Sequence, residues 1–115
     1  MTTNLVGENI QLGLRHPEGF DVYEYAHHEY ANDIYTMTTD PNGQITVAGR
    51  GYIRILMDRD KNGQADQDIP FSNGPPNGAM GLFWENNTLF FTGDGGLHCY
   101  RDENGDLQAD GPSKN

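Results

Sequence analysis

Oxygen-bearing side chains alternate along one short stretch of the chain, which begins at Asp58 and reads DRDKNGQADQDI. The side chains that can supply oxygen atoms stand at every second position: Asp58, Asp60, Asn62, Gln64 and Asp66. A calcium loop of the EF-hand type uses this alternation, with a glycine at a sharp turn and a bidentate Glu that closes the loop. Gly63 stands at the turn position, but the closing position holds Ile69.

A second stretch with the same alternation, RDENGDLQADG, lies 44 residues further along when the two copies of QAD are aligned. Leu107 replaces the turn glycine and Ser113 the closing Glu, so water or a neighbour such as Asp68 would have to complete a calcium shell of about six to eight oxygens. The alternative is an acidic hairpin whose Asp and Asn side chains cap their own backbone. The sequence fits both interpretations. The oxygen-bearing side chains of this second loop are Asp102, Asn104, Asp106, Gln108 and Asp110.

The segments around these loops are predicted to be strands, because no stretch shows a helical period. Residues 20–26 and 33–40 are rich in aromatic and β-branched residues, and strands are also expected over residues 45–50 and 52–58. The Gly, Pro and Asn spacing of residues 69–81 is typical of a connection rather than a strand. Strand, turn, strand, glycine-rich turn and strand then recur before the second acidic loop. The fold class is therefore predicted to be all-β.

The 44-residue offset extends upstream without a gap and pairs Asn42 with Asn86 and Gly49 with Gly93. A four-stranded propeller blade repeats about every 40–45 residues, so this period favours about two blades of a β-propeller, a fragment of a larger ring. We expect an N-terminal extension over residues 1–15 and a partial propeller over residues 16–115. Its blade repeats would cover about 33–76 and 77–115, the second incomplete.

Two blades cannot close a ring of typically about four to eight. The expected partners are therefore the missing blades of a parent propeller or further copies of this chain. Residues 20–26 precede the first full repeat, which suits a strand that joins the last blade of a closed ring.

The charge balance excludes some partners. The formal net charge is −10 and the chain has only seven Lys and Arg residues, which argues against nucleic acid and favours cations. A single cysteine, Cys99, cannot form an internal disulfide, and with His98 beside it offers too few ligands for zinc. Residues 1–15 lack the features of a signal peptide, and no stretch has the length of a membrane helix, so no membrane contact is expected from this segment.

Three further side chains could take part in chemistry. His27 and His28 have Glu29 nearby, but a general base must reach a substrate, and a solvated polar loop is the favoured interpretation. Arg50 lies in the glycine-flanked turn AGRGY, where it could hold an anionic cofactor or substrate through a bidentate fork. The alternative is an exposed turn cation, since the equivalent residue of the next repeat is Asp94.

Residues 16–26, 31–66 and 77–113, which include GRGYIRIL, GDGGL and the paired acidic loops, resemble the opening of the planctomycete-type membrane-bound dehydrogenase domain. That domain is similar to the glucose and sorbosone dehydrogenase propellers, and in the family it often precedes a cytochrome c module with a CxxCH haem motif. The resemblance implies a periplasmic or cell-envelope oxidoreductase. It also implies pyrroloquinoline quinone over the central channel, with quinone and haem bound only by the full-length parent.

In the family, a histidine-rich segment follows the second acidic loop, and in the related sugar dehydrogenases the catalytic histidine lies in a later blade. Neither that segment nor CxxCH is found in this sequence. We therefore expect a segment of a quinoprotein-like sugar or alcohol dehydrogenase propeller with calcium-type acidic loops that is not catalytic by itself. The alternative is a non-catalytic propeller module for binding or scaffolding, because the fold hosts many functions.

Overall fold

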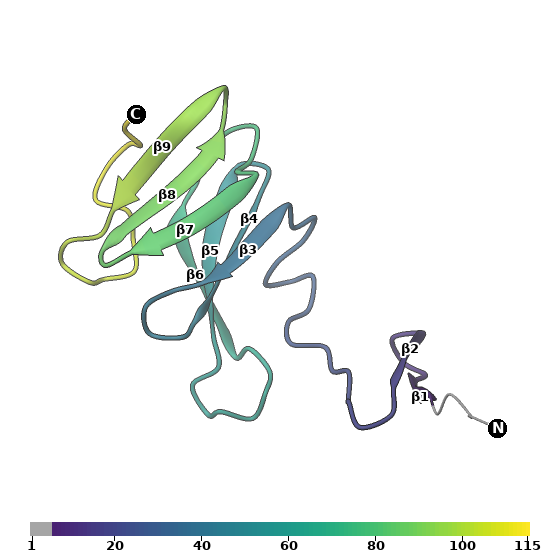
Figure 1. Ribbon diagram of the computed structural model, residues 1–115. Helices are drawn as coiled ribbons and strands as arrows, with labels where there is room; N and C mark the ends of the chain where they lie inside the picture. The colour runs from purple at the N-terminus through teal and green to yellow at the C-terminus, as the bar shows by residue number, and fades with distance from the viewer. Residues whose placement is uncertain (1–5) are drawn as a thin grey trace.

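Antiparallel β-sheets joined by turns make up the protein (Figure 1), a computed structural model that describes residues 6–115. The nine strands in this range come with no helix, which confirms the all-β prediction. None of residues 6–115 belongs to a helix with the length and apolarity that crossing a membrane requires.

A short hairpin comes first and lies apart from the other sheets in Figure 1. Its strands are β1 (Val6–Asn9) and β2 (Leu14–Pro17), so β2 crosses the expected boundary between residues 15 and 16. The Asn9 side chain supports the turn by accepting the Leu12 N–H at 3.0 Å, and it donates to the Val22 carbonyl at 2.7 Å.

The remaining strands form two sheets. The first has the order β3 (Thr36–Thr39), β4 (Ile45–Gly49), β5 (Tyr52–Met57) and β6 (Gln67–Ser72). The second has the order β7 (Gly81–Glu85), β8 (Thr88–Gly93) and β9 (Gly96–Arg101). The two sheets are successive along the chain, and β4 and β8 occupy equivalent positions in them, as the repeat predicts.

Two predictions about single segments are wrong. Residues 20–26 contain no strand, because their backbone contacts a loop rather than a strand edge: the Tyr25 carbonyl accepts the Ala65 N–H at 2.7 Å. Residues 69–81 are not wholly a connection, because β6 extends to Ser72. Pro70 is tolerated there because β6 is the edge strand of its sheet and needs no second ladder partner.

The core lies between the two sheets, which Figure 1 shows stacked across one another. Alternate residues of the strands β4 to β9 point into it, as the period of two in a strand requires. Trp84 of β7 crosses the interface and donates its indole N–H to the Thr46 hydroxyl of β4 at 2.9 Å. The fully enclosed apolar cluster consists of Ala48, Ile53, Ile55, Phe71, Ala79, Leu89, Phe91 and Tyr100.

The repeat is structural as well as sequential, with one correction. Strands β5 and β9 match at an offset of 44, but the pairs Thr39↔Ile45 and Trp84↔Leu89 show that the β3–β4 turn is one residue longer than the β7–β8 turn. Upstream of that turn the offset is 45, so the expectation that the offset of 44 continues upstream without a gap is wrong.

Candidate functional site

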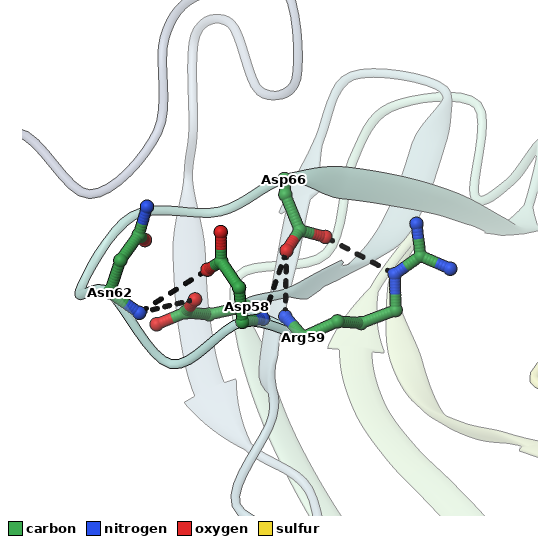
Figure 2. Close-up of polar contacts among 5 residues, drawn as sticks. Asp58, Arg59, Asn62 and Asp66 are labelled. Carbon is green, nitrogen blue, oxygen red and sulfur yellow. Dashed lines mark hydrogen bonds and ion pairs between the residues drawn. The ribbon is translucent and has the colours of Figure 1, made fainter.

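The first acidic loop connects β5 to β6, and its own side chains fix its course (Figure 2). One carboxylate oxygen of Asp58 accepts the Gly63 N–H at 2.8 Å and the other accepts the Asn62 N–H at 3.1 Å. Asp66, at the far end, accepts the Arg59 N–H at 2.8 Å. Gly63 has a φ of 89°, a backbone conformation that favours glycine, so the turn position was predicted correctly.

The second loop, after β9, repeats these bonds at an offset of 44. Asp102 accepts the Leu107 N–H at 2.9 Å and the Asp106 N–H at 3.2 Å, and Asp110 accepts the Glu103 N–H at 2.8 Å. Leu107 takes the glycine's role with a φ of 64°, and its side chain packs against the core. The same two aspartate positions therefore organise both loops, and only the residue at the turn differs.

Each loop brings three carboxylates together. In both groups, one oxygen from each residue lies within 4.8 Å of the others. The oxygen of Asn62 has another role, because it accepts the Gln64 N–H at 2.9 Å, and Ile69 lies in β6 against the core rather than at the loop mouth. The groups are Asp58, Asp60 and Asp66, and Asp102, Asp106 and Asp110.

The balance between burial and hydrogen bonding gives the two leading carboxylates opposite pKa shifts. Asp102 is 6 % exposed, and removal from water is the main reason why its pKa lies above the usual 3.8, against the N–H of Leu107, which lowers it. Removal from water also acts to raise the pKa of the more exposed Asp58, but the N–H bonds led by Gly63 outweigh it and lower that pKa. Each loop is therefore organised by a hydrogen-bonded carboxylate, whose pKa is lowered in the first loop and raised in the second.

The loops differ in their cations. The Nε of Arg59 lies 3.3 Å from Asp66 in an exposed ion pair, whereas the equivalent residue in the second loop is Glu103. Exposed ion pairs contribute little to stability. Because Glu103 stands where the first loop has Arg59, the second loop is more negative. The sequence contains this difference, but the alternation of oxygen-bearing residues does not reveal it.

Tyr25 is a neighbour of the first loop that the sequence did not indicate. It lines a cleft of about 540 Å³ beside the loop together with Asp58, Arg59 and Lys61. Partial burial raises the pKa of its hydroxyl, and the negative charges of Asp58 and Asp66 raise it further. Residues 20–26 therefore lie against the first acidic loop.

The remaining sequence candidates lie elsewhere. Arg50 is exposed in the β4–β5 turn, and its counterpart Asp94 accepts the Asn77 side-chain N–H at 2.9 Å. The Nδ1 of His27 lies 2.5 Å from the Glu24 carboxylate, and His28 is exposed.

His98 stacks on Phe91, with ring centroids 5.3 Å apart, and therefore points into the sheet interface. As the next residue of the same strand, Cys99 points to the opposite face, so the two cannot ligate one metal ion.

No family model, no curated protein and no solved structure matches this chain.

Proposed function

We propose that this chain forms two adjacent blades of a β-propeller, within a quinoprotein-like sugar or alcohol dehydrogenase of the cell envelope. The observation that carries the propeller is the repeated sheet and loop. The hydrogen bonds around Asp58 recur around Asp102, and the Tyr35 N–H bond to Ala48 (2.8 Å) recurs as Met80 to Thr92 (2.7 Å). Stacked repeats of this kind bury their faces against their neighbours.

The spacing of the two sheets supports the same arrangement. The backbones of the two sheets come closest at β3 and β7. On the other side, aromatic rings fill the space between β6 and β9, where Phe71 and Tyr100 meet with centroids 6.0 Å apart. Two sheets that converge at their first strands form a wedge, the shape required of blades around an axis.

Spin-label distances test the wedge in a Cys99→Ser background, since Cys99 is the sole cysteine. One pair of labels replaces Met37 on β3 and Phe83 on β7, and the other replaces Pro70 on β6 and Arg101 on β9. We expect the first distance to be clearly shorter. Equal distances would indicate parallel layers of a sandwich and would contradict the blade arrangement.

The dehydrogenase part of the proposal is supported by the resemblance of the sequence alone. The second candidate is a non-catalytic propeller module. The observation that favours it is the separation of the reactive groups, with His27 paired to Glu24 and His98 packed on Phe91. The reading frame downstream of residue 115 discriminates between the two. A histidine-rich blade and a CxxCH motif would support the oxidoreductase, and their absence would favour the module.

Calcium is the cation that the loop chemistry suits best, because carboxylate and carbonyl oxygens are the ligands that this hard cation takes. What supports it is the occurrence of a three-carboxylate group at the same place in both repeats. A hydrogen-bonded carboxylate oxygen retains a second lone pair, so the N–H bonds of Asp58 and Asp102 leave ligand capacity. The role would be structural, since each loop joins the third strand of its sheet to the segment that follows.

A further inference from the structure

Five asparagines of the chain are followed directly by glycine, and this pair of residues is chemically labile. An asparagine side chain can be attacked by the backbone nitrogen of the next residue, and glycine favours the reaction because it has no Cβ to obstruct the approach. Whether a pair reacts in the folded chain depends on what holds the glycine N–H. The pairs begin at Asn42, Asn62, Asn73, Asn77 and Asn104.

Two of these glycines donate their N–H to a backbone carbonyl. Gly43 donates to the Asp40 carbonyl at 3.0 Å, and Gly78 donates to the Pro75 carbonyl at 3.0 Å. A hydrogen-bonded N–H keeps its proton, and the nitrogen must lose that proton before it can attack. The asparagines before these two glycines are therefore protected while the fold is intact.

Two further glycines donate their N–H to a side chain. Gly63 donates to the Asp58 carboxylate at 2.8 Å, and Gly74 donates to the Ser72 hydroxyl at 3.1 Å. These bonds protect the preceding asparagines in the same way. Unlike the bonds to backbone carbonyls, each can be removed by a single substitution of the acceptor.

Gly105 differs from the other four glycines. Among residues 6–115, no acceptor forms a hydrogen bond with its N–H, and Asn104 and Gly105 are both exposed. The cause is the place of the glycine in the loop. In the first loop the glycine stands at the turn, where Asp58 accepts its N–H. In the second loop Leu107 makes the equivalent bond, and the glycine stands two residues earlier.

We propose that Asn104 is a site of spontaneous modification, at which the folded chain deamidates selectively. The Gly105 nitrogen loses its proton to solvent base and bonds to Cγ of Asn104. The bond from Cγ to the side-chain nitrogen then breaks, and that nitrogen takes up a proton and leaves as ammonia, so that a cyclic imide remains. Water opens the ring at one of its two carbonyl carbons. The product is aspartate, or isoaspartate in which the backbone runs through the side chain.

The aspartate product makes the second loop more similar to the first. At the offset of 44 the equivalent of Asn104 is Asp60, a member of the three-carboxylate group of the first loop. The side-chain oxygen of Asn104 accepts the Asp106 N–H at 3.2 Å, and a carboxylate oxygen can accept the same bond. Deamidation to aspartate therefore adds a carboxylate at a position where the first loop already has one.

The isoaspartate product has the opposite effect. It lengthens the backbone by a methylene group inside the segment that Asp102 holds through the N–H groups of Asp106 (3.2 Å) and Leu107 (2.9 Å). Asp102 is 6 % exposed, so the loss of an N–H partner leaves a buried oxygen without a donor. Isoaspartate therefore loosens the second loop alone. The inference depends neither on calcium nor on the proposed dehydrogenase.

Peptide mapping by mass spectrometry tests the proposal on the whole folded chain, kept at mildly alkaline pH and sampled over time. We expect Asn104 to deamidate about tenfold faster than Asn42. Asn42 is the matched internal control, because it is also exposed but its glycine N–H is hydrogen-bonded. In urea, where no fold holds the N–H groups, all five pairs should react at similar rates.

Two outcomes of this mapping would overturn the proposal. The first is an equal rate at Asn104 and Asn42 in the folded chain. The second is a preference for Asn104 that persists unchanged in urea, because neighbouring residues rather than the fold would then be its cause. Asn104→Asp supplies the reference peptide for the aspartate product.

Removing the acceptor of a protected glycine should create a second site. Asp58→Ala frees the Gly63 N–H, so we expect Asn62 to deamidate in the folded variant while Asn42 stays unmodified. Because Asp58→Ala also weakens the first loop, Ser72→Ala is the milder variant.

Ser72→Ala frees the Gly74 N–H and should make Asn73 reactive. A low rate at Asn42 in the same sample shows that the variant is still folded. A folded variant without any gain at Asn73 would overturn the proposal, because the hydrogen bond to the glycine N–H would then not be what protects an asparagine.

Discussion

Asp58 and Asp102 have the same hydrogen-bonding role at equivalent positions, yet their titration differs because Asp102 is buried and Asp58 is not. The folded pKa of Asp58 is lowered below 3.8, so its contribution to stability is present above the unfolded pKa and is lost as pH falls through the folded pKa. The folded pKa of Asp102 is raised, so its contribution is present below the unfolded pKa and is lost as pH rises through the folded pKa.

Replacing each residue with Asn tests these opposite signs. We expect Asp58→Asn to lower the stability relative to the unmodified chain at neutral pH, with the difference shrinking in acid. Asp102→Asn should gain on the unmodified chain as pH rises past the usual Asp range, because an amide has no charge to bury. Urea unfolding at a series of pH values measures both, and parallel pH dependences of the two variants would contradict the assignment.

Trp84 links the two sheets through one hydrogen bond to a hydroxyl that is fully buried. Trp84→Phe keeps an aromatic ring against Phe71 but removes the donor, so we expect a loss of about 1–3 kcal/mol in unfolding free energy. Circular dichroism during urea unfolding measures it. Thr46→Val in the same background should add less than it costs alone, because the partner is already absent. Strict additivity would mean that the bond contributes nothing.

At the level of elements, local patterns were sufficient where a strand and its partner are neighbours in sequence. The hairpins of β4 with β5 and of β8 with β9 were predicted because alternation and a glycine turn determine both strand and register. Residues 20–26 have the same composition but no partner edge, and a lone strand is not stable. The edge strand β6 was missed because Pro70 and the following Gly and Pro residues resemble a loop.

The acidic loops were located from sequence, and so was the turn position of Gly63. The sequence could not show which side-chain oxygens already accept hydrogen bonds within the loop. The Asn62 side-chain oxygen accepts the Gln64 N–H, and Asp66 forms an ion pair with Arg59. Such contacts depend on a backbone course that several turn types allow.

Calcium binding is tested best at the loop residue with the smallest structural role. Asp60 accepts the N–H of Asn62 at 3.3 Å and is exposed, whereas Asp58 holds the turn itself. Calcium at about a hundredfold excess over its dissociation constant should stabilise the chain by about 2.7 kcal/mol. Melting curves with calcium and with chelator measure this.

Asp60→Ala should reduce the calcium shift without lowering the melting temperature in chelator. Asp58→Ala is the contrasting variant, because it should lower the melting temperature even in chelator. Identical curves for the unmodified chain with and without calcium would leave the acidic hairpin as the better interpretation.

At the scale of the whole molecule, the two sheets close one interface and leave another of the same kind exposed. The far face of the sheet β3–β6 is partly covered by the segment before β3, where the Tyr30 carbonyl accepts a hydrogen bond from Arg54 at 2.7 Å. The outer face of the sheet β7–β8–β9 has no such cover among residues 6–115, and Phe83 and Leu97 there are 62 % and 61 % exposed. The two outer faces of the unit therefore differ.

The small number of sheets limits the chemistry that the chain can carry out alone. Hydride or proton abstraction needs a base within reach of a substrate that lies over a bound cofactor. In a propeller the floor beneath such a cofactor is assembled where several blades meet at the axis, and in the proposed arrangement β3 and β7 would supply only two of the strands that line it. We therefore expect no sugar or alcohol dehydrogenase turnover from the 115-residue chain supplied with pyrroloquinoline quinone, calcium and an artificial electron acceptor.

The histidines give this last prediction its controls. His27 and His28 are exposed in the segment before β3, and His98 is stacked on Phe91 and bonded to the Gly93 carbonyl at 3.0 Å. Turnover above a protein-free control that disappears in His27→Ala or His28→Ala would mean that this segment carries a base after all. Turnover that survives both changes together with His16→Ala and His98→Ala would contradict the mechanism inferred from the resemblance, because none of the four histidines would then be responsible for it.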